Sequence, residues 1–72
     1  MIEDAIYSHH REAAVHLEHA AEHHRFAAAL LEAGDVQNAN CHASIALVHK
    51  QRASEHAAQA AQMQARIPGA NG

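Results

Sequence analysis

The segment AAALLEAGDVQNA, residues 27–39, decides the fold, because it joins two long runs of helix-forming residues through a very short turn. Gly34 suits the left-handed conformation that ends many helices, and Asp35 directly after it is a preferred N-cap for the next helix. A connection this short makes successive helices antiparallel. The segment therefore predicts a helical hairpin that turns at Gly34 and Asp35.

On both sides of this turn the chain is rich in alanine, leucine, glutamate, glutamine and arginine, which all favour helix. We expect helices over residues 3–33 and 36–67. Glu3 and Asp4 suit the N-terminal end of the first helix, and Pro68 stops the second. The sequence thus predicts an all-α fold with one domain, the hairpin of residues 1–67, followed by a disordered tail over residues 68–72.

The two predicted helices share a pattern in which histidine and alanine alternate at steps of four and three residues. Such steps form a heptad seam, the stripe along which two helices pack. A shift of 33 residues superimposes the two patterns, and we interpret the helices as a duplication of one ancestral helix. The seam histidines are His9, His16, His23, His42, His49 and His56.

The register of the two helices decides how these rings meet. If the turn sets the register, each histidine faces an alanine, and a large ring opposite a methyl group packs well. The rings then alternate between the helices at levels about 5 Å apart along the axis. A slip of three residues would pair histidines directly, so the sequence leaves two registers open. The order expected along the seam is His9, His56, His16, His49, His23, His42.

A chain of 72 residues buries little surface and usually needs an additional source of stability. Its one cysteine, Cys41, cannot form an internal disulfide. We therefore expect hairpins to associate into a four-helix bundle, which makes the protein its own partner in a homodimer or larger homo-oligomer. The apolar residues beside the seam that a second hairpin would cover include Ile6, Leu17, Leu31, Val36 and Leu47.

Charge and hydropathy argue against several other partners. The net charge is −3 with only five lysines and arginines, so we expect no nucleic-acid partner. No apolar run reaches the roughly 18 residues of a membrane span, and we expect no membrane partner. The acidic N-terminus is unlike a secretory signal, which makes the cytoplasm the expected location. No glycine-rich phosphate loop or Ser/His/Asp arrangement is evident, and we do not expect an enzyme.

The nine histidines are the main functional signal. Imidazole is a preferred ligand of copper, zinc, nickel and cobalt, so the seam predicts a transition-metal site used for storage or buffering. Histidines seven residues apart on one helix lie about 10 Å apart, so each site must draw on both helices, as when His16 joins His56. Met63 beside His9 would make a softer site suited to Cu(I). The expected ligands are His9, His16, His23, His42, His49, His56 and Met63.

Other residues and other functions stay open at this point. His19 and His23, four residues apart, form a separate chelating pair, and we interpret the series of Glu12, Glu18 and Glu22 as a solvated face. One alternative function is a structural or protein-interaction hairpin whose histidines only pack. Another is haem held axially by two histidines, although the seam offers few large apolar side chains to line a haem pocket.

Several short elements resemble small Ala/His-rich bacterial hairpin proteins: His23–Arg25, Leu31–Asp35, Ala39, His42–Ala43, Ala46 and Glu55–Ala57. The resemblance covers residues 9–61 and implies a helical hairpin, with no activity to carry over. The turn is also similar to the middle of a tetratricopeptide repeat. The helices here are about twice as long as those of that repeat and lack its aromatic signature, so we interpret the likeness as shared turn chemistry.

Overall fold

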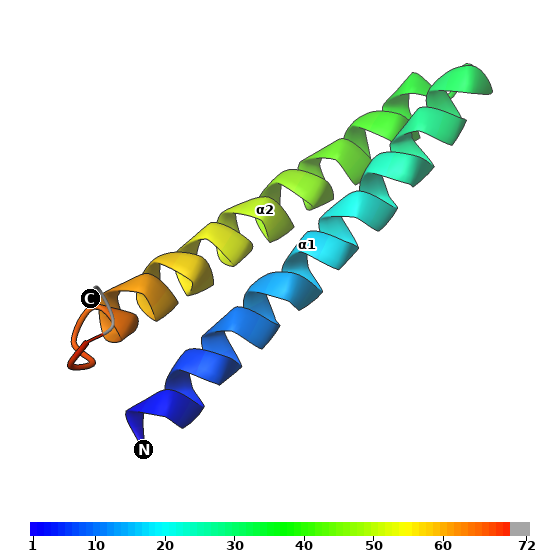
Figure 1. Ribbon diagram of the computed structural model, residues 1–72. Helices are drawn as coiled ribbons and strands as arrows, with labels where there is room; N and C mark the ends of the chain where they lie inside the picture. Colours follow the sequence, from blue (N-terminus) through cyan, green and yellow to red (C-terminus); the bar gives the residue numbers. More distant parts are fainter. Residues whose placement is uncertain (70–72) are drawn as a thin grey trace.

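The protein is a pair of antiparallel helices. The structure, a computed structural model, describes residues 1–69 and contains α1 (Ile2–Glu32) and α2 (Val36–Gln64). The helices lie side by side, and the start of α1 and the end of α2 lie at the same end of the hairpin (Figure 1). The molecule is a rod that measures 54 × 16 × 16 Å. The predicted all-α hairpin is confirmed.

The turn between the helices satisfies the backbone at both helix ends. Gly34 has a φ of +83°, and its amide donates to the Leu31 carbonyl at 3.0 Å. The Asp35 amide donates to the Leu30 carbonyl at 2.8 Å, which completes a Schellman motif. The Asp35 carboxylate then caps α2 by accepting hydrogen bonds from the side chain and the backbone amide of Asn38 at 2.7 and 3.2 Å. These hydrogen bonds, the side-chain one foremost, hold the pKa of Asp35 below its usual value.

The second helix ends earlier than predicted. We expected α2 to continue to Ile67, but it ends at Gln64. The amides of Arg66 and Ile67 instead donate to carbonyl oxygens three residues earlier, the tighter turn common at helix ends. The cause is Pro68, whose ring disfavours helical dihedrals at the residue before it. Of the predicted tail, residues 70–72 lie outside the described residues.

The core is a stripe of small side chains between the helices. Alanines at the contact positions let the two backbones approach closely. Ala46 and Ala60 are completely enclosed, with 0% exposure. Within residues 1–69 no large side chain is fully buried, so the hairpin has a narrow core. The buried residues are Ile6, Ala13, Ala20, Ala27, Ala39, Ala46, Ala53 and Ala60.

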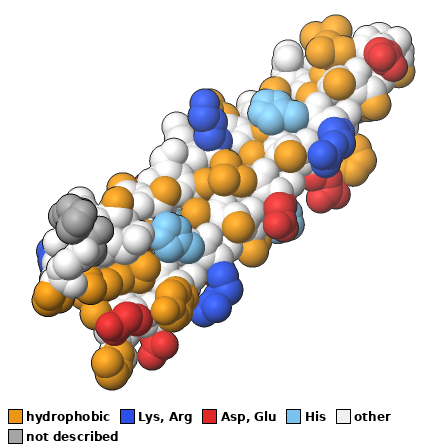
Figure 2. Space-filling model, in the orientation of Figure 1, with side chains coloured by type: hydrophobic (Ala, Val, Ile, Leu, Met, Phe, Trp, Pro, Cys, Tyr) orange, Lys and Arg blue, Asp and Glu red, His pale blue; other side chains and the backbone are white. Residues whose placement is uncertain are grey.

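Much apolar surface stays outside this core. Leu17, Leu31, Val36 and Leu47 are each more than half exposed. Figure 2 shows hydrophobic side chains distributed along the visible face of the rod, between scattered charges. In the described part of the chain, neither helix has an apolar stretch that could span a membrane.

Candidate metal centre

Six histidines form a continuous column between α1 and α2. They meet in three pairs across the helices, and in each pair the two Nδ1 atoms lie 2.9 Å apart and the ring centroids 5.1 Å apart. Stacking connects one pair to the next: the centroids of His16 and His56 lie 5.8 Å apart, and those of His23 and His49 lie 5.9 Å apart. We call this set the histidine column, and its pairs are His9–His56, His16–His49 and His23–His42.

The order of rings along the column is the order predicted from the sequence. The column also has the direct pairing that the alternative register would give, because each ring contacts a histidine of the opposite helix. The long imidazole side chains reach across the seam to meet, while the alanines between them remain buried. All six rings are half-buried, so they are shielded by the helices but still reachable from solvent.

Each pair imposes a protonation pattern on its rings. A neutral imidazole has one N–H donor and one nitrogen acceptor. Two Nδ1 atoms 2.9 Å apart therefore form a hydrogen bond only when one carries a proton and the other does not. The hydrogen bond is therefore lost when both rings of a pair are charged. A metal ion binds an imidazole nitrogen only when that nitrogen carries no proton.

A row of α1 side chains flanks the column at seven-residue spacing, and each contacts a different level. At one level a carboxylate, Glu12, approaches His56. At the next level an imidazole stacks on His49, with centroids 5.1 Å apart. At the level nearest the turn a phenyl ring lies 5.2 Å from His42. The three flanking residues are Glu12, His19 and Phe26.

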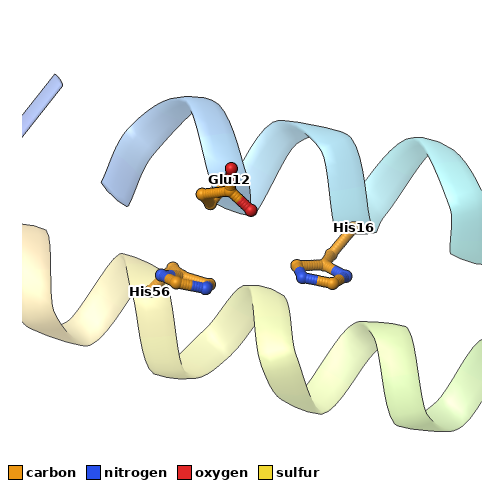
Figure 3. Close-up of side chains that lie close together, drawn as sticks. All are labelled: Glu12, His16 and His56. Atoms are coloured by element: carbon orange, nitrogen blue, oxygen red, sulfur yellow. The ribbon is translucent and has the colours of Figure 1, made fainter. Parts of the chain in front are cut away.

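The level with the carboxylate is the candidate metal centre. One ligand atom from each of Glu12, His16 and His56 lies within 4.8 Å of the other two (Figure 3). Tetrahedral zinc needs ligand atoms about 3.3 Å apart, so small side-chain rotations would close the site. Two imidazoles and one carboxylate suit zinc, copper, nickel and cobalt. Within residues 1–69 no other three His, Cys, Asp or Glu side chains bring ligand atoms this close.

Glu12 was not among the ligands expected from the sequence. Glu12 is exposed, as expected for a solvated face, but its carboxylate also reaches the column. The available signal was its spacing, because Glu12 lies four residues before His16 and such residues are neighbours on a helix surface.

The other predicted ligands lie outside this cluster. His9 and His42 lie in the outer pairs and are not part of the cluster with Glu12, and Met63 is half-buried one heptad beyond His56 on α2. His23 and His49 stack on each other at an angle of 10°, with centroids 5.9 Å apart. The structure therefore brings two of the seven predicted ligands, His16 and His56, into the compact cluster.

His49, at the middle of the column, has the most perturbed environment. Burial lowers the pKa of His49 below its ordinary value of 6.5, and the charges of His19, His16, His23 and Arg52 lower it further. This effect keeps the ring neutral, which is the ligand form of imidazole.

Comparisons of this chain with protein-family models, curated proteins and solved structures found no match. The candidate metal centre is therefore defined by its own geometry. Glu12 and His16 come from α1, His56 comes from α2, and the antiparallel packing brings the three together.

Proposed function

We propose that this hairpin binds divalent transition-metal ions, namely copper, zinc, nickel or cobalt, and that it stores or buffers them. The observation that carries the proposal is the convergence of Glu12, His16 and His56 on one point between the helices. Two histidines and one glutamate are a ligand set typical of zinc sites that leave the fourth coordination position for water or an exchanging ligand.

Exposure of the cluster suits buffering. Glu12 is exposed and the two histidines are half-buried, so an ion has a direct path to and from solvent. A closed site with four protein ligands would hold its ion more permanently, as structural zinc sites do. Three ligands at an open surface favour exchange.

We also propose that two hairpins pair through their apolar faces to form a four-helix bundle. A compact protein of 7.8 kDa exposes about 4,400 Å². This hairpin exposes 5169 Å², and the excess is close to the roughly 800 Å² that each partner buries in a stable interface. A second copy is the natural occupant, because each hairpin presents the same exposed apolar side chains beside the seam, among them Leu17 and Leu47.

The first prediction tests metal binding through stability. Adding Zn(II) or Cu(II) to untagged apo protein should raise its melting temperature, because an ion that binds only the folded state stabilises that state. At 100 times the dissociation constant the gain is about 2.7 kcal/mol, or roughly 15–20 °C for a domain of this size. Thermal melts followed by circular dichroism measure the rise.

Variants locate the ion. The double variant His16→Gln, His56→Gln should lose part of the rise, and adding His23→Gln and His49→Gln should abolish it. His24→Gln is the matched control, because His24 is exposed and lies outside the column. If metal raised the melting temperature of the quadruple variant as much as that of the parent, the proposal would be contradicted, and the histidine column would serve only to pack the helices.

The second prediction tests assembly. Leu17 is 54% exposed in the hairpin, so Leu17→Glu should cost a lone hairpin little. In a bundle the same change buries a charge at the interface, and the dimer should dissociate. Sedimentation equilibrium at micromolar concentration measures the mass, with Ala58→Glu on the outward face as the control. A folded parent protein that sedimented as a monomer would contradict the bundle.

A further inference from the structure

We infer that the hairpin has a second metal site, a three-histidine site formed by His19, His23 and His49. This inference rests on the proposed function, since it assigns a second ion to the same column. It is distinct from the cluster at Glu12, because none of its ligands is shared with that cluster.

The first support is that the second site is a heptad translation of the first. Moving seven residues forward on α1 and seven back on α2 keeps the same positions on the seam. Ring geometry repeats accordingly: the two column rings of the first site lie 5.8 Å apart at an angle of 11°, and those of the second lie 5.9 Å apart at 10°. The translation converts Glu12, His16 and His56 into His19, His23 and His49.

The second support is the spacing of the α1 ligands. His19 and His23 are the one pair of histidines four residues apart in the sequence. Residues at this spacing are neighbours on a helix surface, so their side chains can hold one ion together. The two rings also share a neighbour, because the centroid of His49 lies 5.1 Å from that of His19 and 5.9 Å from that of His23.

His19 must move to close the site. When both sites are filled, the His16–His49 hydrogen bond must also open, because each ring then presents an unprotonated nitrogen to its own ion. The His19 ring stacks on the face of His49 at an angle of 30°, and the three rings do not bring ligand nitrogens within 4.8 Å of one another. His19 is exposed, and an exposed side chain changes rotamer readily. A rotation away from the stack is what a His19 nitrogen needs in order to reach the same ion as His23 and His49. Three neutral imidazoles with an open position make a set suited to Zn(II).

The same translation also limits the number of sites. At either end of the column it gives sets with a single histidine each, which lack three nitrogen or oxygen ligands. The column therefore has two sites for Zn(II) and no third. The two outer sets are Ala5, His9 and Met63, and Phe26, Leu30 and His42.

The test is a count of zinc ions. Untagged full-length apo protein is titrated with Zn(II) and followed by native mass spectrometry and calorimetry, with ions counted per chain. We expect two ions per chain in the parent and one in His19→Ala. His24→Ala is the matched control, since it removes a neighbouring exposed histidine outside both sites, and it should retain two ions. Glu12→Ala should lose the other ion and bind one.

The outcomes separate this inference from the proposed function. One ion per chain in the parent, with no change in His19→Ala and loss in Glu12→Ala, would overturn the second site and leave the first. Two ions in His19→Ala would also overturn it. A parent that bound no zinc would overturn both proposals. His19 is exposed and outside the core, so its variant should keep the helical circular dichroism of the parent, which the same samples verify.

Discussion

Ala46→Leu should separate the two helices and lower the melting temperature by more than about 10 °C. Ala46 is fully enclosed between α1 and α2, with 0% exposure. A leucine there adds three heavy atoms to a contact in which the backbones already approach closely. Overpacking of this kind costs about 1–3 kcal/mol and occasionally more. A protein with so narrow a core has little stability to lose.

The same substitution should also damage the column. The rings of His16 and His49 meet with their Nδ1 atoms 2.9 Å apart, and this contact depends on the spacing of the helices. Ala46 lies one helical turn before His49 on the seam, so a larger side chain pushes these rings apart. We therefore expect Ala46→Leu to weaken zinc binding as well as folding.

Ala58→Leu is the matched control for Ala46→Leu. It makes the same chemical change on the same helix, but Ala58 is exposed on the side away from the seam. Its melting temperature should stay close to that of the parent. Thermal melts by circular dichroism compare the three proteins. An Ala46→Leu variant as stable as the parent would show that the helices do not pack closely on alanine.

The turn and the seam made the fold predictable from the sequence. Gly34 and Asp35 each have one strongly favoured role, and the structure shows both. The heptad pattern placed the alanines and histidines on the contact face, and the buried residues follow it. The end of α2 was less predictable, because helix-forming residues continue past Gln64 and only Pro68 opposes them.

The site was predictable in part. The seam spacing gave the order of the rings, because that order depends only on the antiparallel direction. Direct pairing was one of the two arrangements that the sequence left open, and it depends on which way each ring turns across a gap that alanine leaves open. Glu12 was missed for a related reason: it lies beside the seam, and the reach of its carboxylate is set by side-chain rotamers. Patterns of spacing identify faces, whereas packing decides which side chains meet.

Lowering the pH should destabilise the apo protein, with the melting temperature falling by roughly 10 °C or more between pH 8 and pH 5. Each histidine pair is joined by a hydrogen bond between two Nδ1 atoms. If both rings of a pair become charged, both Nδ1 atoms carry protons and the bond is lost. Two cations then also face each other between the helices. Charging both rings of a pair therefore costs the folded protein a contact that the unfolded chain does not have.

The direction of the effect follows from proton linkage. Burial and the neighbouring charges of His19, His16, His23 and Arg52 lower the pKa of His49 in the folded protein. In the unfolded chain the same ring titrates near 6.5. Between these two values the unfolded state binds more protons, so stability is fully present above about pH 6.5 and is lost as the pH falls toward the folded value. Bound metal should steepen this loss, because protons compete for the same nitrogens.

The measurement is a series of thermal melts of apo protein at pH 8, 7, 6 and 5, with mass in solution followed alongside. The control is the double variant His16→Gln, His49→Gln, which removes the central pair and its protonation. Its profile should be flatter than that of the parent, because glutamine does not titrate in this range. A parent profile that stayed flat from pH 8 to pH 5 would show that the rings are protonated without cost. The column would then not hold its nitrogens ready for an ion, and the structural argument for a metal site would lose its basis.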